Sequence, residues 1–139
     1  MKCLVILSIA TIFVGVESYV VPTPRVQLLY PRGFQVSIPD SPGVQLFAFH
    51  GNINREMEGI EAGEYSADVL RPRNNRWTYK NPTAPLNPGD TLYFWTMVHV
   101  DGVGYQKLFQ QFYVPGDCPR IPDDTVSPRR SGIDIRISS

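Results

Sequence analysis

The chain has little cysteine and no net charge, and each of these shortages excludes a class of protein. Only 2 of its 139 residues are cysteines, too few for a disulfide scaffold or a four-cysteine zinc site. Its 13 Lys and Arg balance 13 Asp and Glu, so it lacks the overall field that attracts nucleic acid or an anionic membrane. We therefore expect no nucleic-acid partner, no membrane partner and no bound metal.

Sequence patterns of catalysis are missing as well. His50 and His99 are the only histidines, and neither stands in a metal-ligand spacing such as HExxH. No serine stands in GxSxG. The dense acidic run at 56–64 falls in a predicted loop, where a solvated acidic loop is a simpler interpretation than a catalytic pair of carboxylates. We expect no catalytic residues, no cofactor and no enzymatic activity.

The long apolar run stands at the N-terminus. Lys2 gives a positive start, 3–16 is almost unbroken apolar sequence, and Ser18 closes a segment of the kind that signal peptidase cleaves. The run is shorter than the roughly 20 residues that span a bilayer. We predict a signal peptide over 1–18 and a secreted, extracellular product, in which Cys118 is left without a second cysteine.

The remainder of the chain favours strands and turns. Its 13 prolines are roughly twice the average usage, and few helices tolerate so many. Asp101-Gly102 is a strong hairpin signal, and 52–62 is the one stretch that could be helical or irregular. Alternation and turn residues predict strands at 26–30, 34–38, 45–50, 64–70, 76–79, 91–100 and 103–114. This spacing predicts an all-β fold, an immunoglobulin-like β-sandwich of about seven to eight strands, over 19–114, followed by a disordered tail over 115–139.

The predicted strand at 91–100 divides its residues between two faces. One set is apolar enough for a core, and it comprises Leu92, Phe94, Thr96, Val98 and Val100. The other set suits a half-exposed contact surface, and it comprises Tyr93, Trp95, Met97 and His99. The run at 86–93 resembles a tyrosine corner, which would instead turn Tyr93 and Trp95 inward. On the basis of the alternation we predict that Trp95 points outward. For Trp77 we favour a position in the core over a role as a second exposed platform.

Several runs follow one another in the order and spacing of a known module. They include Phe47-Ala48-Phe49-His50-Gly51, Glu61-Ala62-Gly63, Arg76-Trp77-Thr78-Tyr79 and Tyr93-Phe94-Trp95-Thr96. Over roughly 19–114 the chain resembles the N-terminal domain of insect β-1,3-glucan recognition proteins, also called Gram-negative bacteria-binding proteins. The resemblance implies a sandwich that binds β-1,3-glucan or a related microbial surface polysaccharide, reports microbes to innate immunity, and self-associates on its ligand.

The resemblance also implies carbohydrate-binding residues. Asp68 stands where the family has a sugar-contacting acid, and Trp95, with Thr96 beside it, where the family has a sugar-contacting indole. Met97 stands where the glucan binders have Tyr, and Gln106 where they have Arg. Replacing Arg by Gln costs on the order of 1–2 kcal/mol of binding free energy, and losing the phenol hydroxyl of Tyr costs about 1 kcal/mol more. We therefore predict a weakened or shifted glycan specificity.

Two alternatives remain open. Met97 and Gln106 are consistent with a sandwich that has lost glycan binding and acts as a protein-interaction module. Full-length members of the family carry a second, glucanase-like domain after a linker, so the chain is either a short single-module relative or a truncated gene product.

Overall fold

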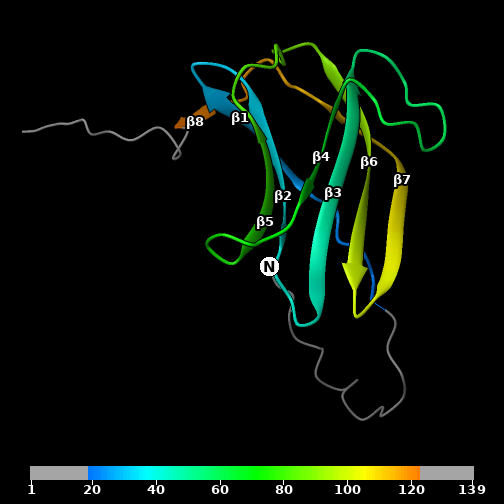
Figure 1. Cartoon of the computed structure of the whole chain (residues 1–139). Helices are drawn as coiled ribbons and strands as arrows, with labels where there is room; N and C mark the ends of the chain where they lie inside the picture. Colours follow the sequence, from blue (N-terminus) through cyan, green and yellow to red (C-terminus); the bar gives the residue numbers. More distant parts are fainter. Residues whose placement is uncertain (1–18, 123–139) are drawn as a thin grey trace, which may run out of the picture.

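The computed structural model describes residues 19–122, and these form an all-β fold. The predicted signal peptide and residues 123–139 of the predicted tail lie outside the described residues. Eight strands follow one another along the chain (Figure 1): β1 Arg25–Tyr30, β2 Phe34–Pro39, β3 Val44–Ile53, β4 Tyr65–Val69, β5 Arg76–Asn81, β6 Thr91–Val100, β7 Val103–Tyr113 and β8 Arg120–Pro122.

The strands form two sheets of four that face one another, as Figure 1 shows. One sheet has the order β5-β2-β1-β8 and the other the order β4-β3-β6-β7. Strand β2 lies between β1 and β5, and β3 and β6 are the central pair of the second sheet, as in immunoglobulin-type sandwiches. The predicted fold class is confirmed.

The core lies between the sheets and is built from alternate residues of their strands. Phe34, Phe47 and Phe49 have no exposed surface, and the rings of Phe34 and Phe49 meet edge to face with centroids 6.0 Å apart. Trp77 is 3% exposed, and its Nε1 donates to Asp40 Oδ1 at 2.8 Å. The predicted core position of Trp77 is therefore confirmed.

The β6–β7 hairpin follows its local sequence closely. Strand β6 occupies the predicted range, and Asp101 and Gly102 both have positive φ, 52° and 84°. Two such residues in succession make the turn whose twist matches that of paired strands. The hairpin at Asp101-Gly102 is confirmed.

The end of the domain differs from the prediction. Residues 120–122 form β8, which pairs in parallel with β1, so a disordered tail beginning at residue 115 is wrong for 115–122. The Arg120 guanidinium fixes this segment, since it donates to the carbonyl oxygens of Leu29 (2.7 Å) and Leu86 (2.9 Å). A strand of three residues held by one arginine has no periodicity that sequence analysis could detect.

Candidate functional site

Three of the predicted site residues lie in one row on the outer face of the β4-β3-β6-β7 sheet. Asp68 pairs with Ala48, Ala48 with Met97, and Met97 with Gln106. Directly opposed residues have Cβ atoms about 4.5–5.5 Å apart, so the row crosses all four strands, with the buried Ala48 between Asp68 and Met97. Asp68 and Gln106 are exposed and Met97 is half-buried. The aromatic face is this row together with the adjacent rings of His50, Trp95 and His99.

Thr96 does not belong to the aromatic face. It is 0% exposed, and it alternates with Trp95 and Met97, so it points to the other side of β6. Its hydroxyl accepts a hydrogen bond from Gln110 Nε2 at 3.1 Å. The prediction of Thr96 as a carbohydrate-binding residue is corrected here, because a fully buried side chain has no surface to offer a sugar.

Trp95 faces outward but is covered. It lies opposite His50 across the β3–β6 ladder, and the two rings stack with centroids 4.2 Å apart and planes 13° apart. Its Nε1 donates to the Glu61 carbonyl oxygen at 2.8 Å. Only 6% of the residue is exposed. The outward direction agrees with the prediction, whereas the expectation of an exposed apolar platform is wrong: the half-buried His50 ring lies against the indole.

The loop over 54–64, which is irregular rather than helical, covers this part of the face. Asn52, 0% exposed, holds it: its Nδ2 donates to Glu61 Oε2 (3.2 Å) and its Oδ1 accepts from the Glu64 amide (2.7 Å). Gly63 has φ +82°, and a Cβ there would lie 2.7 Å from the Gly51 carbonyl oxygen. The Glu-Ala-Gly turn therefore serves close contact between loop and strand.

The Glu61 carboxylate sits at the centre of that loop. Its Oε2 accepts from the Glu58 amide at 2.9 Å and from Arg55 Nη1 at 3.4 Å. The hydrogen bond from the Glu58 backbone amide is the main cause that lowers the pKa of Glu61. Arg55 and Asn52 lower this pKa further, whereas desolvation raises it. An ionised Glu61 thus stabilises the loop that covers Trp95.

Tyr93 does not form a tyrosine corner. It pairs with Asn52 and Gln111 and alternates with Leu92 and Phe94, which belong to the core. The irregularity in this region lies on β7, where one extra residue stands between the partners of Phe94 and Thr96. The alternation of β6 is therefore uninterrupted, and Tyr93 and Trp95 share the outer side.

The β7 end of the aromatic face includes a glycine, Gly104, that sequence analysis did not single out. A Cβ at Gly104 would lie 3.3 Å from the His99 ring and 3.5 Å from Met97 Sδ. The side chains of His99 and Met97 therefore converge over Gly104, which has no side chain of its own. Gln106 also borders a shallow hollow of about 580 Å³ that is shared with Tyr19 and Lys107. Hence His50, His99 and Gly104 join the candidate residues. Only their pairing across the strands reveals them.

Within 19–122 no group of three or more His, Cys, Asp and Glu side chains is placed to hold a metal ion. That part of the chain also contains no helix with the length and hydropathy needed to cross a membrane.

The fold and this face define a β-sandwich binding module. The family model CBM39, described as "Carbohydrate binding domain (family 32)", matches residues 20–129. The chain belongs to this family of carbohydrate-binding domains, which confirms the resemblance seen in the sequence.

Named relatives agree with this assignment. The chain is 42% identical to Gram-negative bacteria-binding protein 3 of Drosophila melanogaster, over 94% of this chain and 29% of that protein. It is 41% identical to Beta-1,3-glucan-binding protein 1 of Galleria mellonella, over 83% of this chain and 23% of that protein. The chain therefore spans less than a third of either relative. Among solved structures, the crystal structure of a Br derivative of BhCBM56 gives a TM-score of 0.49 at 14% identity, covering 70% of this chain and 96% of that chain.

Proposed function

We propose that the protein is a secreted, non-catalytic recognition module that binds microbial β-1,3-glucan through the aromatic face. The single observation that carries the proposal is the row of Asp68, Met97 and Gln106 across the outer face of one sheet. Relatives named as β-1,3-glucan-binding proteins support the choice of ligand, and membership of a carbohydrate-binding family supports a binding role without catalysis.

The chemistry of the row suits a sugar chain. Sugars present apolar C–H faces ringed by hydroxyl groups, so a site needs an apolar contact flanked by fixed hydrogen-bonding groups. The Met97 thioether supplies the contact, the Asp68 carboxylate accepts from hydroxyl groups, and the Gln106 amide both donates and accepts. Trp95 acts as a positioning residue, because its indole supports the His50 ring from beneath.

Weak single sites are compatible with a repeating polymer. A hydrogen bond to a charged group contributes about 1.5–3 kcal/mol and one between neutral groups about 0.5–1.5 kcal/mol, so Asp68 supplies the strongest contact of the row. Several copies that self-associate along one polymer gain avidity without any new contact to the sugar.

The test is co-sedimentation of the purified protein with insoluble β-1,3-glucan, with cellulose as the control polymer. We expect enrichment on the glucan only. Asp68→Ala should weaken binding roughly ten- to a hundredfold, as expected from the loss of one charge-assisted hydrogen bond. The matched control is Asp117→Ala, an exposed aspartate outside the face, which should bind like wild type. Equal recovery on cellulose would remove the glucan proposal, and wild-type binding by Asp68→Ala would remove the aromatic face as its site.

A second candidate function is protein recognition. The extra residue on β7 leaves Phe109 82% exposed, and Tyr113 on the same strand is 61% exposed. Exposed aromatic rings are common anchors of protein interfaces, and Met97 and Gln106 are weaker sugar contacts than Tyr and Arg. Affinity purification from haemolymph separates the candidates: a protein recovered without glycan by wild type, and lost with Phe109→Ala, favours this function.

A further inference from the structure

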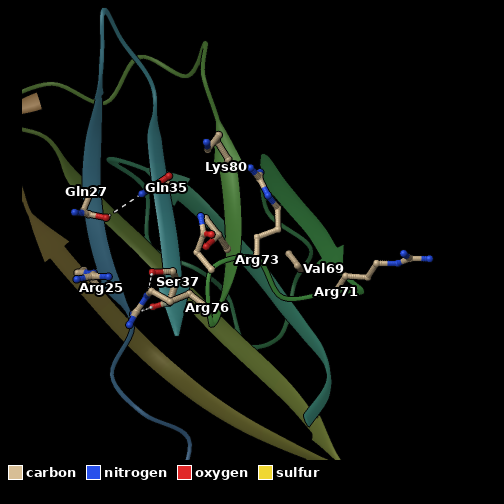
Figure 2. Close-up of a pocket in the computed structure, with 11 residues that line it drawn as sticks. Arg25, Gln27, Gln35, Ser37, Val69, Arg71, Arg73, Arg76 and Lys80 are labelled. Carbon is tan, nitrogen blue, oxygen red and sulfur yellow. Dashed lines mark hydrogen bonds between the residues drawn. The ribbon is translucent and has the colours of Figure 1, made fainter. Parts of the chain in front are cut away.

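The opposite sheet carries a second polar face. Outward residues of β1, β2 and β5 form two rows, one of Arg25, Ser37 and Thr78 and the other of Gln27, Gln35 and Lys80. Figure 2 shows these strands side by side, with the β4–β5 turn beside them. The basic face consists of these six residues together with Arg71, Arg73 and Arg76, which line the same hollow of about 250 Å³.

The lining of this hollow is charged with one sign. Arg25, Arg71, Arg73, Arg76 and Lys80 contribute to it, and no carboxylate does. Among residues 19–122 no salt bridge joins any of the four arginines to an acidic side chain. The whole chain is neutral, so the basic face is a local concentration of charge.

The fold positions two of the arginines, Arg73 and Arg76. Arg76 donates from Nε to Ser37 Oγ at 2.9 Å and from Nη2 to the Ser37 carbonyl oxygen at 3.2 Å. Arg73 and Arg76 are joined by backbone hydrogen bonds of 2.8 and 3.0 Å around a turn in which Asn74 and Asn75 both have positive φ. The turn therefore sets both side chains opposite one another, whereas Arg71 extends away from the group in Figure 2.

The clustering of positive charge affects the pKa of Arg76. Burial is the main cause that lowers the pKa of Arg76, and the nearby Arg25 guanidinium lowers it further. A bound anion would relieve the repulsion between these two guanidinium groups.

The other groups on the face narrow the ligand class. Gln35 Nε2 donates to Gln27 Oε1 at 2.9 Å, and Thr78 on the edge strand β5 pairs with Ser37, so amides and a hydroxyl flank the cations. No aromatic residue lines the hollow, and Val69 is the single apolar residue there. Single-stranded nucleic acid is bound with stacked aromatics and a membrane surface with an apolar face. Arg pairs with phosphate, sulfate and carboxylate groups, and amides suit sugar hydroxyls.

We propose that the basic face binds an anionic polysaccharide, a sugar chain bearing phosphate, sulfate or carboxylate groups. The site lies on the opposite sheet from the aromatic face. It therefore adds a second polymer class to the glucan proposal and does not depend on it.

The test measures binding of the purified protein to immobilised dextran sulfate and to neutral dextran. We expect binding to dextran sulfate alone, falling as salt is raised because charge pairs on a surface are screened. The double variant Arg25→Gln/Arg73→Gln should lose about tenfold in affinity, as expected for two exposed ion pairs. Both residues are exposed, so the fold should survive the change.

Matched controls locate the effect. The variant Arg32→Gln removes positive charge from an exposed site outside the face and should keep wild-type affinity for dextran sulfate. A loss in Arg32→Gln equal to that in Arg25→Gln/Arg73→Gln, or no loss in Arg25→Gln/Arg73→Gln, overturns the proposal. Asp68→Ala should retain dextran sulfate binding, and Arg25→Gln/Arg73→Gln should retain glucan binding, so failure of one proposal is distinguishable from failure of the other.

Discussion

The two outer faces of the sandwich are made in the same way and carry different chemistry. Each sheet turns alternate residues into the common core, so its other residues are free to differ. The aromatic face presents one row with a single carboxylate, and the loop over 54–64 covers its indole. The basic face presents amides and hydroxyls, and the β4–β5 turn adds guanidinium groups. On each face a connecting loop decides what is exposed. The loop over 54–64 covers the indole of the aromatic face, and the β4–β5 turn adds positive charge to the basic face.

The sharpest test of this comparison is Trp95→Ala. The indole is 6% exposed, stacked and hydrogen-bonded, so its removal should lower the free energy of unfolding by about 3–5 kcal/mol. Urea denaturation measures it. Phe109→Ala removes an 82% exposed ring and should stay within about 0.5 kcal/mol of wild type. Wild-type stability of Trp95→Ala would show that the ring is an open platform after all.

Asn52→Ala should have the next largest effect. The change leaves the Glu64 amide without its 2.7 Å partner and frees Glu61 Oε2 from one donor. A loss of about 1 kcal/mol follows for a part-buried hydrogen bond, with increased acrylamide quenching of tryptophan fluorescence as the loop loosens. The control is Gln111→Ala, an exposed amide on the same sheet. Unchanged quenching in Asn52→Ala would separate the loop from the covering of Trp95.

The double variant Met97→Tyr/Gln106→Arg sharpens the comparison by strengthening one face only. It restores the two residues that the family resemblance implies, and we expect glucan affinity to rise roughly tenfold from a new charged donor and a hydroxyl. Co-sedimentation with insoluble β-1,3-glucan measures the change, and Gln111→Arg adds the same charge outside the row. A rise in the Gln111→Arg variant alone would contradict the role of the row. Dextran sulfate binding should not change with Met97→Tyr/Gln106→Arg.

The smallest expected effect is the loss of loop stability at acidic pH. Because the pKa of Glu61 is lowered in the folded protein, the carboxylate stabilises the loop above the pH near 4.3 at which an unfolded glutamate titrates. That stability is lost as the pH falls through the lower, folded value. The Glu58 amide, which donates to Glu61 Oε2, should report this titration by NMR with a midpoint below about 4.3. Glu61→Gln should abolish the transition, and a midpoint above that value would contradict the role of the hydrogen bond.

Local pattern was sufficient where neighbours in sequence decide the structure. The alternation of 91–100 predicted β6 and the outward direction of Trp95, and Asp101-Gly102 predicted the hairpin. The alternation also placed Thr96 on the core side, and its burial agrees with that placement, whereas the family resemblance implied a sugar contact. Local pattern was insufficient for β8, where Arg120 donates to the carbonyl oxygen of Leu29, 91 residues earlier in the chain.

What the sequence alone determined is therefore the sandwich, its alternation and its family, since each depends on spacing along the chain. Only the tertiary structure decided which side chains meet: Asp68, Met97 and Gln106 in one row, an indole under a loop, and arginines gathered on the other sheet. The physical reason is that exposure and charge density depend on distances between strands, and those distances exist only after the two sheets have formed and packed.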